Sequence, residues 1–563
     1  QFGAQRVEVL RGAASLLYGS DALGGVINIL DPLPAADGQV KGELLTNYAS
    51  NNGLSGSSVM LEGNADGFIW RGRGSYKNAF SYNTPEGRIA NTGFNELNIS
   101  GQLGLNKEWG YTHLDFSSFK SELGLPDFER NAAGQFIDED GNVLSSSQLK
   151  DRQLLLPFQD VRHYKLALNS NILIGTGRLR SNFAYQDNQR RELEESPSEP
   201  SLFFDLKTYS YDLKYYFQEK WGWEPVIGIA GSFQENVNKA EELLIPDYKS
   251  NDFGVFGYGK KTWRNVTTLS IGARFDRRNI TGDQMLEGTE EKFNAFTNTF
   301  SNISGALGFT QEFNDQWSFK ANLGSAFRAP NIAELNSNGI HEGTFRYEIG
   351  NTALDPEKSI YGDMAVEFAG EKASATIGVF NNYINHYIYY RQFNNEVIAV
   401  EGEEFPVFRY TQDNANLYGA EAGLTLHPLE VLHFENTFSF TRGKNRTTHQ
   451  ALPFIPAAAL RNEIRIEPDI AGLNETYFSV ELDNVFRQND IDVFETVTGG
   501  YTLVNAAIGT TFMLNKQPIR VNIAASNLFD KAYVSHLSRL KYEGILNQGR
   551  NVSVGIYVPF IFN

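Results

Sequence analysis

Many segments of this sequence alternate between apolar and polar residues with period two. In the last of them the apolar residues of one parity are Val552, Val554, Ile556, Val558, Phe560 and Phe562. Successive residues of a strand point to opposite faces, so this pattern predicts a strand with one apolar face. Similar alternation runs through 269–276 and 519–526. These segments reach about 10 residues, the length with which a tilted strand crosses a bilayer, whereas strands of globular proteins average about 5–6.

The connections between the alternating segments fall into two length classes. Short ones are expected at 65–67, 107–110, 175–177, 314–316, 370–372, 428–429 and 515–517. Long ones are expected at 77–93, 122–160, 190–206, 277–300, 328–355, 443–456 and 531–547. Short turns that alternate with long loops are typical of outer-membrane barrels. The pattern predicts an all-β fold, a transmembrane antiparallel β-barrel of about 22 strands, with both ends periplasmic and the long loops outside.

Composition narrows the possible functions. The chain has 563 residues and no cysteine, which excludes disulfides and cysteine-based metal sites. Its net charge of −18 argues against a nucleic-acid partner, because nucleic acid is bound by basic faces. We see neither an apolar run long enough for a transmembrane helix nor a signal peptide. Because the chain starts at Gln1, we expect a truncated or processed N-terminus.

One motif near the N-terminus is long and ordered. Residues 5–30 read QRVEVLRGAASLLYGSDALGGVINIL. The pattern predicts two short strands, 7–10 and 24–30, joined through a turn at Arg11 and a short helix. A nucleotide-binding loop is the competing interpretation of the glycines, but no GKS or GKT follows and no GxGxxG opens a helix. The segment resembles the end of the plug domain of TonB-dependent outer-membrane receptors, close to VEVLRGPxSxLYGxxAxGGVINI, with Ala13 in place of the usual proline.

The resemblance continues along the whole chain. FRAPN at 327–331 followed by Glu334-Leu335 resembles the FRAPxxxEL signature of these receptors, and LDPEKS at 354–359 resembles their LxPExS strand entry. NLFDK at 527–531 resembles the element that precedes their final strand. The resemblance implies that 1–34 is the C-terminal end of a plug domain and 35–563 the receptor barrel. We expect the rest of the plug, with the TonB box, to precede Gln1.

The resemblance also implies a function. Such receptors sit as monomers in the outer membrane of Gram-negative bacteria, among lipid and lipopolysaccharide, and TonB with ExbB–ExbD pulls on the plug to drive import. They carry out no bond chemistry, so the chain is expected to be no enzyme and to need no cofactor. A passive porin and an adhesin-type barrel are the alternatives, and the plug-like segment argues against both.

Three charged residues are expected to hold the plug in the barrel. In related receptors the arginine of the RG turn meets glutamates on two barrel strands, and the matching positions are Arg11, Glu367 and Glu421. Both glutamates fall on the parity that faces the lumen. The alternative is that they are ordinary solvated lumen charges, because a charge is expected to point inward whatever its role.

The ligand candidates are mostly histidines. His341, His449 and His536 fall in predicted outer loops, and His386 lies near one. Glu342 and Glu348 follow His341, and imidazole with carboxylate suits zinc or iron. The stretches 341–351 and 536–541 resemble loops of zinc- and haem-type receptors. We therefore expect a metal-linked ligand (a ferric siderophore, haem or zinc), although no residue set defines a metal site and the histidines could simply be surface residues.

Aromatic residues allow two interpretations. Tyr387, Tyr389 and Tyr390, with Trp221 and Trp223, fit the aromatic girdles of a membrane barrel. They could instead stack on a siderophore.

Overall fold

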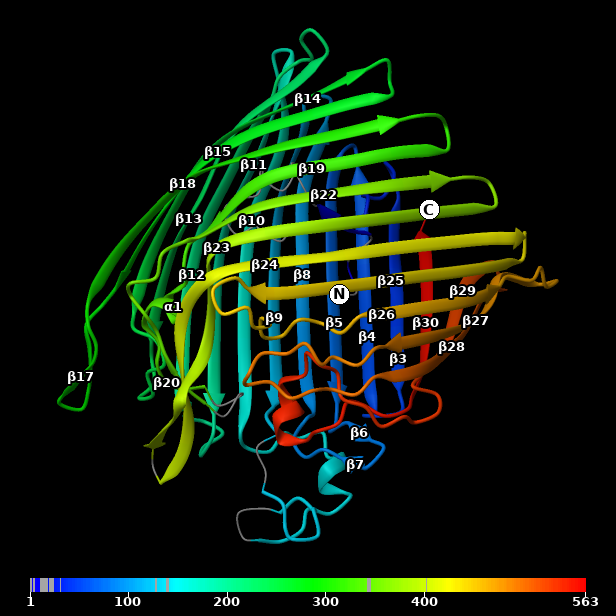
Figure 1. Cartoon of the computed structure of the whole chain (residues 1–563). Helices are drawn as coiled ribbons and strands as arrows, with labels where there is room; N and C mark the ends of the chain where they lie inside the picture. Colours follow the sequence, from blue (N-terminus) through cyan, green and yellow to red (C-terminus); the bar gives the residue numbers. More distant parts are fainter. Residues whose placement is uncertain are drawn as a thin grey trace.

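The computed structural model describes residues 3, 6–10, 19, 25–30, 32–126, 129–137, 141–341, 346–400 and 402–562. Within this part of the chain, 22 antiparallel strands form the wall of a closed barrel (Figure 1). The first eleven are β3 (Val40–Ala49), β4 (Leu54–Ala65), β5 (Phe68–Ala79), β8 (Phe94–Lys107), β9 (Gly110–Gly124), β10 (Phe158–Ile174), β11 (Gly177–Leu193), β12 (Leu202–Tyr216), β13 (Trp223–Asn238), β14 (Tyr248–Trp263) and β15 (Thr267–Gly282).

The remaining wall strands continue in chain order. They are β18 (Phe296–Glu312), β19 (Trp317–Arg328), β22 (Glu357–Ala369), β23 (Ala373–Val400), β24 (Glu403–Leu429), β25 (Leu432–Asn445), β26 (Ala459–Ile466), β27 (Leu473–Val485), β28 (Tyr501–Leu514), β29 (Gln517–Ser526) and β30 (Asn551–Phe562). The strand count and the final strand confirm the prediction from the alternating pattern.

Smaller elements decorate the barrel. They are the hairpins β1–β2 (Arg6–Leu10 and Val26–Leu30), β6–β7 (Asn83–Thr84 and Gly87–Arg88), β16–β17 (Met285–Glu287 and Glu290–Phe293) and β20–β21 (Asn338–His341 and Arg346–Ile349), with the helices η3 (Gln148–Lys150), α1 (Ile332–Asn336) and η5 (Arg539–Glu543). No helix within the described ranges is long and apolar enough to cross a membrane.

The wall is apolar outside and charged inside. On β15, Ile271 and Phe275 are exposed on the outer face, while Arg274 and Asp276, which have the opposite parity, are buried on the inner face. The cross-strand partner of Phe275 on β18 is Ile303, which is also exposed. An exposed band of large apolar side chains is expected where lipid takes the place of water.

Short turns lie at one rim of the barrel and long connections at the other. Figure 1 draws the long connections at its lower end, near α1, β20 and the β6–β7 hairpin. Six of the seven predicted short turns are found where they were expected, including the tight one at Gly110, where φ is 125°. The seventh lies at 430–431, just after the expected 428–429. A Cβ at Gly110 would lie 1.9 Å from the carbonyl oxygen of Asn171, so the turn requires glycine.

Two of the predicted loops are longer than the connections in the structure. Instead of a loop over 190–206, β11 continues to Leu193 and β12 already starts at Leu202. The sequence pattern suggested a loop over 277–300, but β15 continues to Gly282 and β18 already starts at Phe296. The polar residues after Phe275 were taken for a loop because the outer face of the strand changes there from apolar to polar. Arg277 therefore belongs to the barrel wall and is exposed on its outer face.

The N-terminal segment lies inside the barrel. The hairpin β1–β2 pairs Arg6 with Leu30. Gly3 and Pro32 line a cavity at the inner wall together with Arg71, and Gly19 lines another together with Arg274. The chain then passes from Pro32 along the inner wall to β3.

Candidate functional site

Three charged residues of the inner wall form one row next to the start of the barrel. Lys41 on β3 lies opposite Glu62 on β4, and Glu62 lies opposite Arg71 on β5. The Glu62 carboxylate lies 2.7 Å from Lys41 Nζ and 2.5 Å from Arg71 Nε, and Glu62 is 1% exposed. A buried carboxylate with a cation on each side is strongly held, because the loss of either cation would leave charge unpaired.

The same row fixes the segment that leads into the barrel. Arg71 donates to the carbonyl of Pro32 at 2.8 Å, and Lys41 donates to the carbonyl of Leu33 at 3.2 Å. Asn64 Nδ2 donates to the carbonyl of Ala35 at 3.0 Å. Each wall residue thus binds a different carbonyl of the segment. We call Lys41, Glu62, Asn64 and Arg71 the linker clamp.

A second group of residues gathers at the rim with the long connections. It contains one residue each from β21, β23, β24, the connection after β27 and η5, and we call it the rim cluster: Arg346, Tyr390, Phe408, Phe494 and Arg539. The guanidinium of Arg346 lies 3.9 Å from the ring centre of Tyr390 and 5.6 Å from that of Phe408. Arg539 donates to the Tyr390 hydroxyl at 2.8 Å.

Arg346 is held in place from behind by a carboxylate. Its Nε donates to Oε1 of Glu348 at 2.7 Å, and the Tyr410 hydroxyl donates to Oε2 at 3.1 Å. Both oxygens of Glu348 are therefore used, and the residue is 3% exposed. Glu348 was a candidate metal ligand, and the structure places it as the partner of Arg346.

His536 joins two connections at the same rim. Its Nδ1 lies 3.0 Å from Thr498 Oγ1, and its Nε2 lies 3.4 Å from Oε1 of Glu495. Lys541 Nζ reaches the same carboxylate at 3.0 Å and the carbonyl of His536 at 2.9 Å. Burial raises the pKa of the Glu495 carboxyl, but the hydrogen bonds from His536 and Lys541 outweigh it and lower the pKa to about 2. His536 is 4% exposed, so it is presented to this network rather than to solvent.

The other histidine candidates are dispersed. His341 ends β20 and its side chain, like all of Glu342, lies outside the described residues. His386 occupies a bulge of β23 with φ 56°, and His449 is exposed in a turn with φ 62°. Across the described ranges no group of three or more His, Cys, Asp or Glu side chains could hold a metal ion.

The predicted plug lock is partly visible. Arg11 lies outside the described residues. Glu367 lies on the inner wall and accepts from Lys320 Nζ at 2.7 Å and from Ser318 at 3.2 Å. Glu421 lines an inner-wall cavity of about 540 Å³ that Lys320 also lines. The lock itself stays a prediction.

The sequence reasoning missed the rim cluster. From the sequence, Tyr390 fits either a girdle or a ring that stacks on a siderophore, and Arg346 and Arg539 lie in the stretches 341–351 and 536–541, which were singled out for their histidines and acidic residues. Phe408 and Phe494 carry no motif. The cluster forms because chain segments up to 149 positions apart meet, as Arg539 and Tyr390 do. The one sequence signal that pointed to it is the group of three tyrosines, Tyr387, Tyr389 and Tyr390.

Comparison with known proteins gives consistent matches. The family described as TonB dependent receptor-like, beta-barrel, matches residues 37–528. The chain is 23% identical to the "Iron-regulated outer membrane virulence protein" of Vibrio cholerae, over 99% of this chain and 79% of that protein. It is 21% identical to the "Probable TonB-dependent siderophore receptor PirA" of Acinetobacter baumannii, over 94% and 76%. Among solved structures, "Copper transporter OprC" has a TM-score of 0.80 at 15% identity, with 99% of this chain and 86% of that chain covered.

Proposed function

Because this chain belongs to the TonB dependent receptor-like β-barrel family, we propose that it imports an anionic ferric siderophore whose iron-binding groups are aromatic rings. The barrel is an outer-membrane protein of a family of transporters rather than enzymes. Iron-regulated and siderophore-receptor relatives support the class of ligand.

The rim cluster is the observation that carries the proposal. Planar guanidinium groups pair with anionic oxygens and stack on rings, and aromatic side chains offer flat faces for another ring. Arg346, Tyr390 and Phe408 already stack in this way, and Arg539 is exposed beside them. These groups suit an iron chelate that is both aromatic and negatively charged, whereas a bare metal ion would need imidazole, carboxylate or sulfur donors.

The transport step would use the segment inside the barrel. We take residues 1–34 as the end of a plug domain, which TonB, energised by ExbB–ExbD, would pull on. Import is then a population shift between a closed and an opened plug. The linker clamp would keep the end of the plug fixed to the wall while the rest moves, and Arg11, Glu367 and Glu421 would form the additional lock.

A binding titration tests the ligand. The full chain, purified in detergent, is titrated with a ferric tris-catecholate while its intrinsic fluorescence is followed. Arg539→Ala should weaken binding about tenfold, because a charge-assisted contact is worth about 1.5–3 kcal/mol and each 1.4 kcal/mol is a factor of ten. Arg130→Ala is the matched control, since Arg130 is also exposed in an outer connection and stacks on Phe136 at 3.9 Å.

Two results would contradict the proposal. One is a chelate affinity that is equal in Arg539→Ala, Arg130→Ala and the unaltered protein. The other is uptake of radioactive iron from the chelate that continues in cells lacking TonB, which would point to passive diffusion through the barrel.

A further inference from the structure

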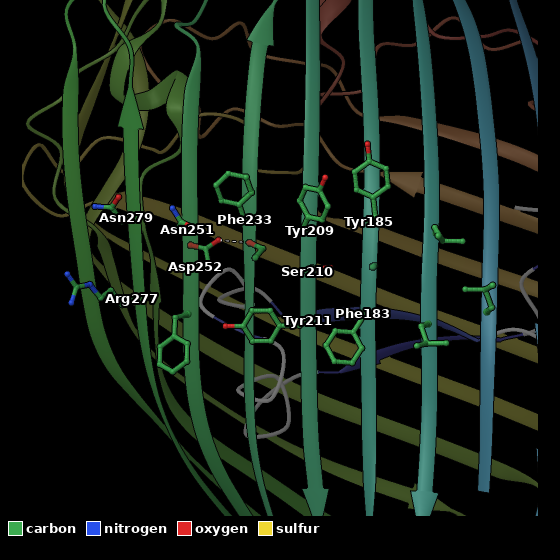
Figure 2. A pocket seen from close by; sticks show the side chains of 16 residues that line it. Phe183, Tyr185, Tyr209, Ser210, Tyr211, Phe233, Asn251, Asp252, Arg277 and Asn279 are labelled. Carbon is green, nitrogen blue, oxygen red and sulfur yellow. Dashed lines mark hydrogen bonds between the residues drawn. The ribbon is translucent and has the colours of Figure 1, made fainter.

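The outer face of the wall carries a groove that the import function does not use. It spans β9 to β15, has a volume of about 780 Å³, and is lined mainly by apolar and aromatic side chains. Figure 2 shows Tyr185, Tyr209 and Phe233 side by side on three neighbouring strands, with Phe183 and Tyr211 below them. All five belong to the parity that faces away from the lumen, opposite to the inner-wall residues Arg274 and Asp276.

Strand pairing explains why the face is hollow at this place. One row across the wall pairs Tyr211 with Gly231, Gly231 with Phe253, and Phe253 with Arg277. Gly231 has no side chain, so the row is interrupted between two aromatic residues. The next row pairs Tyr185 with Tyr209 and Tyr209 with Phe233, and these rings form the upper side of the groove.

Arg277 stands where the apolar band of β15 ends. Below it on the same face lie Leu269, Ile271, Ala273 and Phe275, and above it lie Asn279 and Thr281. Its partner on β18 is Ser301, and the next pair down is Phe275 with Ile303. The change from apolar to polar thus occurs at the same pair on both strands. Arg277 is therefore at the membrane interface on the side of the long connections, which faces outward from the cell.

The charge of Arg277 is not balanced by the neighbouring wall residues. Other cations near this boundary have carboxylate partners: Lys249 lies 3.0 Å from Glu235, and Lys207 lies 3.9 Å from Asp205. Arg278, which points inward, pairs with Asp252 at 2.5 Å. Within the described part of the chain Arg277 has no such partner. A long cationic side chain at this level reaches toward the lipid headgroups, where an anionic group would balance its charge.

We propose that this groove is a binding site for one molecule of lipopolysaccharide. A phosphate of its lipid A would bind Arg277, and an acyl chain would lie against the aromatic side chains of the groove. The occupant follows from charge and position. The outer leaflet of this membrane presents phosphate next to acyl chains, and the groove presents a guanidinium next to apolar side chains. Guanidinium groups bind phosphate oxygens in a two-pronged geometry that ammonium groups lack. The site is independent of which ligand the receptor carries.

Native mass spectrometry of the full chain in detergent tests the site. Lipid A is added at increasing concentration, and phosphatidylethanolamine, which has acyl chains but no net charge, is added in parallel. Arg277→Gln should lower the apparent affinity for lipid A about tenfold, because one charge-assisted contact is lost. Lys249→Gln is the matched control, since Lys249 is an outward cation on the adjacent strand with a partner of its own. Tyr209→Ser should also weaken lipid A binding, by opening the upper side of the groove.

Each variant is first shown to be folded by its heat-dependent migration on a denaturing gel. Equal lipid A affinity in Arg277→Gln and the unaltered chain would overturn the proposal. Equal binding of phosphatidylethanolamine and lipid A would overturn it too, because the groove would then take any acyl chain. A protein dimer in place of a lipid adduct would identify the groove as an interface between copies and would likewise refute it.

Discussion

The linker clamp makes a quantitative prediction about the segment inside the barrel. Glu62→Gln keeps the shape of the side chain but removes the charge that holds Lys41 and Arg71 in their row. Those two cations donate to the carbonyls of Pro32 and Leu33. Without the carboxylate, both are free to turn toward water, and the segment loses two of its three donors from the clamp.

The magnitude follows from the hydrogen bonds. Each bond contributes about 1 kcal/mol net, so the segment loses about 2 kcal/mol of its attachment. Since 1.4 kcal/mol is a factor of ten, the open population should rise about 30-fold. The barrel itself should stay folded, because every strand pair around Glu62 is retained.

A single cysteine can report this opening, because the chain has no cysteine of its own. Ala35 is buried at 4% exposure and its carbonyl is bound by Asn64. In an Ala35→Cys background, the thiol reacts with a maleimide only when the segment leaves the wall. Glu62→Gln should therefore raise the labelling rate about 30-fold, as worked above from two lost bonds.

A control separates the clamp from a general effect of charge removal. Glu96→Gln removes another inner-wall carboxylate, which lies outside the clamp and pairs with Lys77 at a distance of 2.9 Å. This substitution should leave the labelling rate unchanged. A change of less than about threefold in Glu62→Gln, under 1 kcal/mol, would refute the idea that the clamp holds the segment.

Two further predictions concern the connections at the rims. The pKa of Glu495 is lowered from 4.5 to about 2 in the folded protein, so its stabilisation is present above about pH 4.5 and is lost as the pH falls toward 2. Hydrogen exchange, corrected for intrinsic rates, should show 536–541 losing protection in that range, whereas Glu495→Gln should have low protection at every pH. At the opposite rim, Gly110→Ala should reduce the yield of folded barrel severalfold on heat-modifiability gels, because its Cβ would meet the Asn171 carbonyl oxygen. Gly72→Ala, which has open space, should fold normally, and an equal yield of both would contradict the steric argument.

Most of the fold could be predicted from the sequence because each strand of a membrane barrel alternates apolar and polar residues along its own length. Alternation at 551–562 defined β30 to the residue, and the short turns were recognised from polar and glycine-containing breaks. The error at 277–300 has a physical cause. Above the membrane interface the outer face of β15 becomes polar at Asn279 and Thr281, so the apolar alternation on that face disappears while the strand continues to Gly282.

The site was less accessible to sequence reasoning for a different reason. His536 looked like a free ligand candidate, yet its partners Thr498 and Glu495 come from another connection. Glu348 looked like a metal donor, yet its carboxylate binds Arg346 and also accepts from the hydroxyl of Tyr410, 62 positions later. Long connections that fold over a common rim meet in combinations that no local pattern encodes. The chemistry of a residue in such a connection is set by neighbours far away in the chain.

The closure of the barrel has a consequence for how the chain is assembled. β3 pairs with β30, and just beyond it the backbone N–H of Asn51 donates to the side chain of Asn551, 500 positions later. Closing a loop of that length costs about 5–6 kcal/mol of chain entropy. β30 makes ten residue pairs with β3 and seven with β29, whereas β10 and β11 share seventeen. The seam is thus the costliest contact to form and among the shorter ones. Assembly of the barrel should therefore finish at this seam, when the twelve residues of β30 pair with β3 and β29.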